Sequence, residues 1–167
     1  MLTTSKPRKA PDADQDLCVP VVYPTKPQER LLEQTVETCR MLYNDCLAER
    51  RDVYASTGRS VTKVEQLRHV KEIKAANPYA KGVHSHILQV AVADLDKAFR
   101  NFFRRLKTGE KPGYPRFKGR GRFDSFGLKE YGNGFKIDGR RLRISRRNPQ
   151  HYESSGKPTA GTPALLA

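Results

Sequence analysis

The sequence predicts an α+β protein in which a helical part lies between one short strand and a group of basic strands. Two observations predict this class. Apolar residues recur at helical spacing through residues 25–109, interrupted by turn signals. After residue 109 the pattern changes to short alternating runs separated by glycine-containing turns, which is typical of strands. The predicted order is therefore strand, helical insert, basic strands and tail.

The first two segments precede the helices. Residues 1–16 are rich in Pro, Ser, Lys and Asp, and we expect a disordered leader there. Residues 17–24, LCVPVVYP, are short and β-branched and predict one strand. Because a single strand is not stable alone, its partner must come from elsewhere in the chain.

Three helices are predicted within residues 25–109, over 25–54, 60–78 and 84–109. Thr25 and Gln28 have the spacing of a capping box, and Pro27 suits a first turn. The third segment carries a long apolar stripe and is followed by Gly109, a candidate C-cap. Helices with such stripes can bury one another, so we expect a small bundle.

Residues 110–147 are predicted to form the basic strands. Residues 134–145, GFKIDGRRLRIS, are typical of a β-hairpin whose turn is Asp138-Gly139. Residues 148–167 lose all pattern and are expected to be disordered.

The cysteines and the hydropathy indicate a cytoplasmic protein. Cys39 and Cys46 share one face of the first predicted helix and are expected in the core. With Cys18 they form no Cys-x-x-Cys pair, which argues against a disulfide scaffold or a zinc ribbon. The apolar runs are too short for a signal peptide or a membrane span.

Candidate catalytic and metal-binding groups are weak. His84 and His86 are two residues apart, so on a helix they diverge by about 200 degrees, and we expect them exposed and not sharing a metal. Asp94 and Asp96 diverge likewise, with one or both on the solvated face. The glycines of residues 119–121 lack the following helix and Lys-Ser/Thr of a phosphate-binding loop. No catalytic residue, metal or cofactor is predicted.

The charge distribution favours nucleic-acid binding. The net charge is +14, and residues 99–147 hold 16 basic against 4 acidic residues, so +12 of it lies there. Such a concentration indicates a polyanionic partner, while Gly and Pro exclude a helix lying on a membrane. The cations expected to contact nucleic acid are Arg116, Lys118, Arg120, Arg122, Lys129, Lys136, Arg140, Arg141 and Arg143.

The aromatic residues of the same segment leave two interpretations open. Phe117, Phe123 and Phe126 fit either anchors that hold the strands to a core, the commoner role, or faces on which bases stack. Tyr114, Pro115 and Phe117 are expected to be structural parts of a hinge between the third helix and the strands.

Three stretches resemble the N-terminal half of TnpB (OrfB-type) proteins of insertion sequences, a family of transposases known as RNA-guided DNA nucleases. They contain the motifs YPTxxQ, FFRRLKxGxKxGYPRFK and DGxRLRI, in the order and spacing of the family, between residues 21 and 145. The resemblance implies a small wedge-type β-barrel, which need not be complete, with a helix-turn-helix-like part inserted into it. It also implies that Lys63, Ser85 and Gln89 face the DNA motif beside the target.

The resemblance implies a bacterial or archaeal protein associated with the nucleoid. The implied partners are DNA and a structured transposon-derived RNA, held through backbone shape. Full-length members continue into a RuvC-like nuclease and a four-cysteine zinc finger, and neither is seen in this sequence. The change of pattern after residue 145 indicates a frameshifted or prematurely ended copy. We therefore expect a binding module associated with transposition that does not cut DNA by itself. The alternatives are a basic RNA-binding protein of ribosomal type and a gene remnant without a role.

Overall fold

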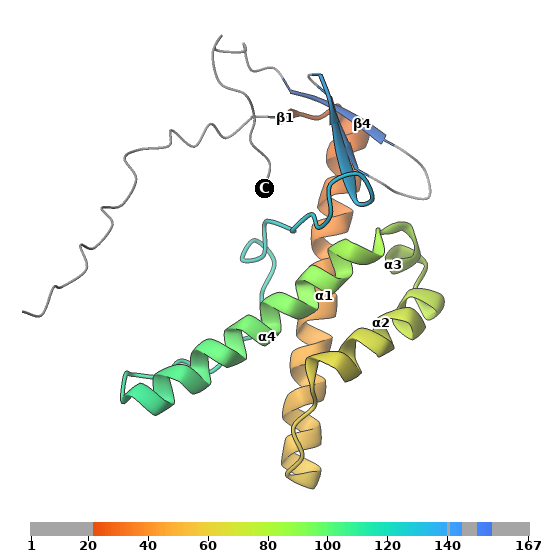
Figure 1. The fold of residues 1–167 in the computed structure, drawn as a ribbon. Helices are drawn as coiled ribbons and strands as arrows, with labels where there is room; N and C mark the ends of the chain where they lie inside the picture. The colour runs from red at the N-terminus through yellow and green to blue at the C-terminus, as the bar shows by residue number, and fades with distance from the viewer. Residues whose placement is uncertain (1–21, 140, 145–149, 155–167) are drawn as a thin grey trace, which may run out of the picture.

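A computed structural model describes residues 22–139, 141–144 and 150–154 (Figure 1). The predicted leader, most of the first predicted strand, Cys18 and much of the tail lie outside the described residues. The described chain is mostly helical, with a small antiparallel sheet. Its elements are β1 Val22–Tyr23, α1 Lys26–Thr57, α2 Lys63–Ala76, α3 Pro78–Gly82, α4 Ser85–Thr108, β2 Phe135–Asp138, β3 Arg141–Ile144 and β4 Gln150–Ser154.

Helix α1 begins and ends at residues with a clear local reason. The backbone N–H of Thr25 donates to the side-chain oxygen of Gln28 at 2.8 Å, as the capping-box spacing predicts. At the other end, Gly58 has φ 68°, a left-handed conformation that favours glycine. The helix therefore continues to Thr57, almost one turn beyond the predicted end.

Helices α2 and α3 share one boundary residue. Thr62 and Glu65 form a capping box at the start of α2, and Asn77 ends that helix. The side-chain oxygen of Asn77 then accepts hydrogen bonds from the N–H groups of Tyr79 and Ala80, so it also starts α3. The sequence predicted the break at Asn77-Pro78 but not the five-residue helix that follows, because one helical turn carries no measurable periodicity.

Helix α4 follows the prediction from end to end, and Gly109 caps it with φ 71°. Its apolar stripe packs on α1 and α2, and the three helices enclose the core. Cys39 and Cys46 are 0% and 3% exposed within it, which confirms their predicted core position. Burial raises the pKa of both thiols to about 12.

The strands form a sheet of order β1-β4-β3-β2 with antiparallel pairing throughout. The predicted hairpin is confirmed: Asp138 pairs with Arg141, and Gly139 has φ 57°. Strand β1 finds its partner in β4, so the helices are inserted between sheet strands as predicted. In the part of the chain that the structure describes the sheet is open, and no barrel is seen.

Strand β4 corrects the prediction for the tail. It lies at residues 150–154, within the segment expected to be disordered, and pairs with β3 on one side and β1 on the other. The physical reason is that both neighbours have a backbone edge that needs hydrogen-bond partners. Composition does not reveal such a non-local pairing. No helix among the described residues is long and apolar enough to cross a membrane.

Candidate nucleic-acid interface

The chain between α4 and β2, residues 110–134, is here called the basic connector, and it returns along α4 and α1 (Figure 1). It is fixed to α1 through the backbone N–H and carbonyl of Lys118. Asn44 accepts from the Lys118 N–H at 2.8 Å and donates to the Lys118 carbonyl at 2.9 Å. Arg40 donates to the same carbonyl at 2.8 Å. The first part of the connector is therefore held by its backbone.

Arg40 is itself held by a two-point ion pair with Glu37. The guanidinium donates to the two carboxylate oxygens at 2.8 and 2.6 Å. This hydrogen bonding lowers the pKa of Glu37 and raises that of Arg40. Sequence reasoning missed both Arg40 and Asn44, because they are 78 and 74 residues from Lys118 and lie in an ordinary helical pattern.

The four cations predicted at the start of the connector have different surroundings. Arg116, Arg120 and Arg122 are exposed. The side chain of Arg120 is 88% exposed, and its ion pair with Glu37 is long, at 3.7 Å. Lys118 is half-buried instead, with Nζ 5.9 Å from the centre of the Tyr43 ring. Three of the four side chains are therefore open to a ligand, and Lys118 is partly engaged by the fold.

The hairpin presents further predicted cations on one face of the sheet. Lys136 and Arg143 are direct cross-strand partners, and Asp138 and Arg141 form the next pair on that face. Like charges directly opposite each other are unfavourable. The carboxylate of Asp138 lies directly opposite Arg141 and 3.8 Å from Arg143. On this face the hairpin therefore carries three cations and one carboxylate.

Lys129 and Arg140 are the other two predicted cations. Lys129 is exposed near the end of the connector, and Arg140 lies outside the described residues.

The aromatic residues of the connector divide between the two interpretations. Phe123 and Phe126 pack against the core, and the Phe123 ring lies 6.0 Å from that of Tyr43. Phe117 is 49% exposed, and the guanidinium of Arg51 lies 5.3 Å from its ring centre. The prediction of a structural anchor therefore holds for Phe123 and Phe126 and is wrong for Phe117, whose ring lies at the surface beside Arg51.

The hinge residues before Phe117 also differ from one another. Pro115 is buried, as expected for a structural residue. Tyr114 is 47% exposed and lies against aromatic rings of α4.

Two of the three residues expected to face a DNA motif lie together. Ser85 and Gln89 are one turn apart on α4, and Lys74 donates a hydrogen bond to the Ser85 hydroxyl at 2.9 Å. Lys63 is the first residue of α2, about 16 Å along that helix from Lys74 at 1.5 Å per residue. All three predicted residues are half-buried. The structure thus brings Lys74 into contact with Ser85, and sequence reasoning missed Lys74.

The histidines correct another prediction. His84 is the N-cap of α4 and has extended backbone, so helical geometry does not separate it from His86, and the two rings lie 4.8 Å apart. Both are half-buried rather than exposed. Burial, followed by the charges of His86 and Lys74, lowers the pKa of His84. Among the described residues no group of three or more His, Cys, Asp or Glu could hold a metal.

The two acidic residues of α4 also differ from each other. Asp94 is exposed, as predicted for at least one of them. Asp96 is half-buried and lies 3.5 Å from Arg50 and 3.2 Å from Arg100.

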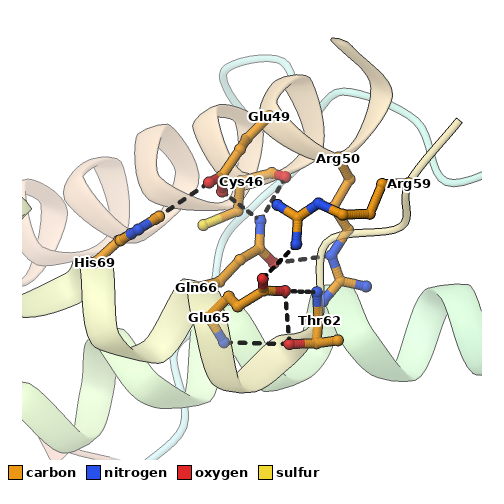
Figure 2. Close-up of polar contacts among 8 residues, drawn as sticks. All are labelled: Cys46, Glu49, Arg50, Arg59, Thr62, Glu65, Gln66 and His69. Atoms are coloured by element: carbon orange, nitrogen blue, oxygen red, sulfur yellow. Dashed lines mark hydrogen bonds and ion pairs between the residues drawn. The ribbon is translucent and has the colours of Figure 1, made fainter. Parts of the chain in front are cut away.

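A buried amide sets the position of α2 against α1 (Figure 2). Gln66 is 0% exposed and donates to the Cys46 carbonyl and to Glu49, both at 2.8 Å. Its oxygen accepts from Arg50 at 2.8 Å. Arg50 reaches Asp96, so the network joins all three long helices.

A second set of contacts beside this network fixes the turn before α2 (Figure 2). Glu65 accepts from the N–H and hydroxyl of Thr62 at 2.7 and 2.8 Å and from Arg59 at 2.5 Å. These bonds, led by that of the Thr62 N–H, lower the pKa of Glu65 to about 2.

Comparison with known proteins confirms the resemblance seen in the sequence. Residues 22–59 match the helix-turn-helix domain family of the OrfB (IS605) type. In the structure this stretch is β1, α1 and the start of the following turn, and α2 begins just beyond it. The chain is also similar to InsQ of Escherichia coli (strain K12), whose name describes it provisionally as an RNA-guided DNA endonuclease. The two are 29% identical over 119 residues, 70% of this chain and 28% of the length of InsQ.

Proposed function

We propose that this relative of the OrfB (TnpB)-type proteins binds nucleic acid, both DNA and a guide RNA, through the basic connector and the basic face of the β2–β3 hairpin. The observation that carries the proposal is the placement of the charge. Residues 99–147 hold +12 of the net +14, and Arg116, Arg120, Arg122, Lys129, Lys136, Arg141 and Arg143 are exposed.

The way the connector is anchored supports a binding role. Asn44 and Arg40 hold the backbone N–H and carbonyl of Lys118, so the neighbouring cations do not have to form ion pairs to keep the loop in place. Neither Arg116 nor Arg122 forms an ion pair with any residue that the structure describes. Exposed cations held on a fixed backbone are suited to phosphates, whose neutralisation releases counterions.

The helical part is proposed to read DNA. Its match to a helix-turn-helix family supports this, as does the contact of Lys74 of α2 with Ser85 at the start of α4. Association with transposition and RNA-guided targeting is proposed from the similarity to InsQ.

Salt dependence tests the binding proposal. The full chain is titrated into a labelled single-stranded RNA and a labelled DNA duplex over a series of salt concentrations. Replacing Arg116, Arg120 and Arg122 together with alanine should weaken binding and reduce the slope of log K against log salt by about 2 to 3. A matched variant replaces the exposed cations Lys26, Arg30 and Lys81 outside the basic segment, and should leave the slope nearly unchanged. Equal losses in the two variants would contradict the placement of the site.

We also propose that the chain does not cut DNA by itself. Two-metal cleavage needs clustered carboxylates. The carboxylates of α4 support the proposal, because Asp94 and Asp96 point to different surroundings and Asp96 is engaged by Arg50 and Arg100. Supercoiled plasmid incubated with the chain and Mg²⁺ or Mn²⁺ should stay intact. Metal-dependent nicking that a carboxylate substitution in this chain abolishes would refute the proposal.

A further inference from the structure

The C-terminal half of α4 carries its apolar stripe onto the surface. Phe99, Phe102, Phe103 and Leu106 lie on one face of the helix, at spacings of three and four residues. Phe99 is 9% exposed, but Phe103 and Leu106 are 52% and 49% exposed. Figure 1 shows the reason: this end of α4 projects beyond the other helices, so the stripe continues past the core that it packs on.

The connector adds a tyrosine to this exposed end. The Tyr114 ring lies 5.6 Å from Phe99 and 5.4 Å from Phe102, in both cases edge to face. Phe103 lies 5.2 Å from Phe102 and 6.3 Å from Phe99. Phe102, Phe103 and Tyr114 are here called the aromatic patch. The contacts between its rings hold them in place, while about half of the surface of Phe103 and Tyr114 stays open.

The surroundings of the aromatic patch are strongly basic. Residues 97–123 contain ten Lys or Arg and a single acidic residue, Glu110. Arg100, Arg104 and Arg105 have side chains that are 72%, 56% and 48% exposed. Glu110 contacts two of them, at 3.3 and 3.8 Å. Exposed rings among cations of one sign are complementary to a polyanion whose bases are unpaired, and not to an apolar protein surface, where charges are depleted.

We propose that the aromatic patch binds unpaired bases of a single-stranded nucleic acid by stacking, while the arginines around it hold the adjoining phosphates. The inference rests on the proposed nucleic-acid binding and adds a site outside the cations named for it. The bases of a duplex are already stacked inside the helix, so the aromatic patch binds single strands in preference to duplexes. Every base has a stackable face, so the site is tolerant of sequence.

The test compares two probes with the same number of phosphates. One is a labelled oligothymidylate of about 12 nucleotides, and the other is an abasic strand of equal length. Wild-type chain should bind the oligothymidylate more tightly. Phe103→Leu, which keeps an apolar side chain without a ring, should weaken binding to oligothymidylate by about five- to a hundredfold and leave binding to the abasic strand unchanged. Phe103→Trp should restore the preference for bases.

Leu106→Ala is the matched control, because Leu106 is as exposed as Phe103 but offers no ring. Its affinity for oligothymidylate should equal that of the wild type. Equal wild-type binding of the two probes would overturn the stacking inference and leave the proposed function standing. Binding of neither probe at low salt would overturn both. Self-association that both Phe103→Leu and Leu106→Ala abolish would identify the patch as a protein interface and also overturn the inference.

Discussion

Replacing Gln66 with leucine removes three hydrogen bonds from the centre of the contact between α1 and α2. Leucine has a similar volume and retains the helix, so the substitution changes hydrogen bonding more than shape. The side chain is 0% exposed, and water cannot replace the lost partners without opening the helix packing. The comparison therefore measures the net free energy of a buried polar network.

The magnitude follows from the partners. The bond to the Cys46 carbonyl is neutral and contributes about 1 kcal/mol, and bonds to the charged Glu49 and Arg50 contribute about 1.5 kcal/mol each at the lower end of their range. The lower end applies to Glu49 because its side chain is 30% exposed, and to Arg50 because its ion pair with Asp96 remains after the substitution. Burial of the leucine side chain returns about 2 kcal/mol. We expect a net loss of about 2 kcal/mol in the free energy of unfolding.

Urea unfolding followed by far-ultraviolet circular dichroism measures this loss as a lower midpoint with an unchanged slope. Glu72→Leu, at an exposed position of the same helix, controls for helix propensity and should change stability by less than about 0.5 kcal/mol. A Gln66→Leu chain as stable as the wild type, or more stable, would refute the reasoning. It would show that apolar packing outweighs this network, as happens for some buried ion pairs.

Three further predictions concern other parts of the fold. Cys39 and Cys46 have a pKa of about 12, so at pH 8 they are thiols and react slowly. In a Cys18→Ser chain, a thiol reagent should therefore label neither cysteine until urea unfolds the protein. Rapid labelling of the native chain would contradict their burial. The pKa of Glu65 is about 2 in the folded protein, below its ordinary value of 4.5. The ionised carboxylate therefore stabilises the fold above pH 4.5, and this stabilisation is lost as the pH falls from 4.5 toward 2. The melting temperature should therefore fall less steeply over that range in Glu65→Gln. Asn44→Ala should increase proteolysis within the connector while the melting temperature of the helices changes little; an unaltered cleavage pattern would mean that Asn44 does not anchor the loop.

The helices could be predicted because their signals are local. The capping pair at Thr25, the break at Asn77 and the C-cap at Gly109 each depend on residues within one turn, and the structure places all three as expected. The histidines show the limit of the same reasoning. Helical spacing separates His84 from His86 only if both are helical, and the N-cap conformation of His84 brings the rings together.

The sheet and the candidate interface depend on contacts between distant parts of the chain. Strand β4 forms because β1 and β3 need partners, and no property of residues 150–154 alone indicates this. Phe117 and Phe123 have similar sequence surroundings, yet one is at the surface and one packs on the core. The difference lies in their long-range contacts: the Phe123 ring packs on Tyr43, and the Phe117 ring lies beside Arg51 at the surface.

The anchoring of the basic connector also explains how a strongly charged loop can be ordered before it meets a ligand. Ion pairs could fix such a loop, but each would neutralise a cation that the ligand needs. Here the loop is fixed at the backbone of Lys118, whose carbonyl accepts a hydrogen bond from Arg40. The nearby acid, Glu37, already accepts hydrogen bonds from Arg40 on both carboxylate oxygens. Arg120 therefore stays 3.7 Å from that carboxylate and 88% exposed. A phosphate can bind at Arg120 without breaking a short ion pair, so the loop is ordered in advance and its charge remains available.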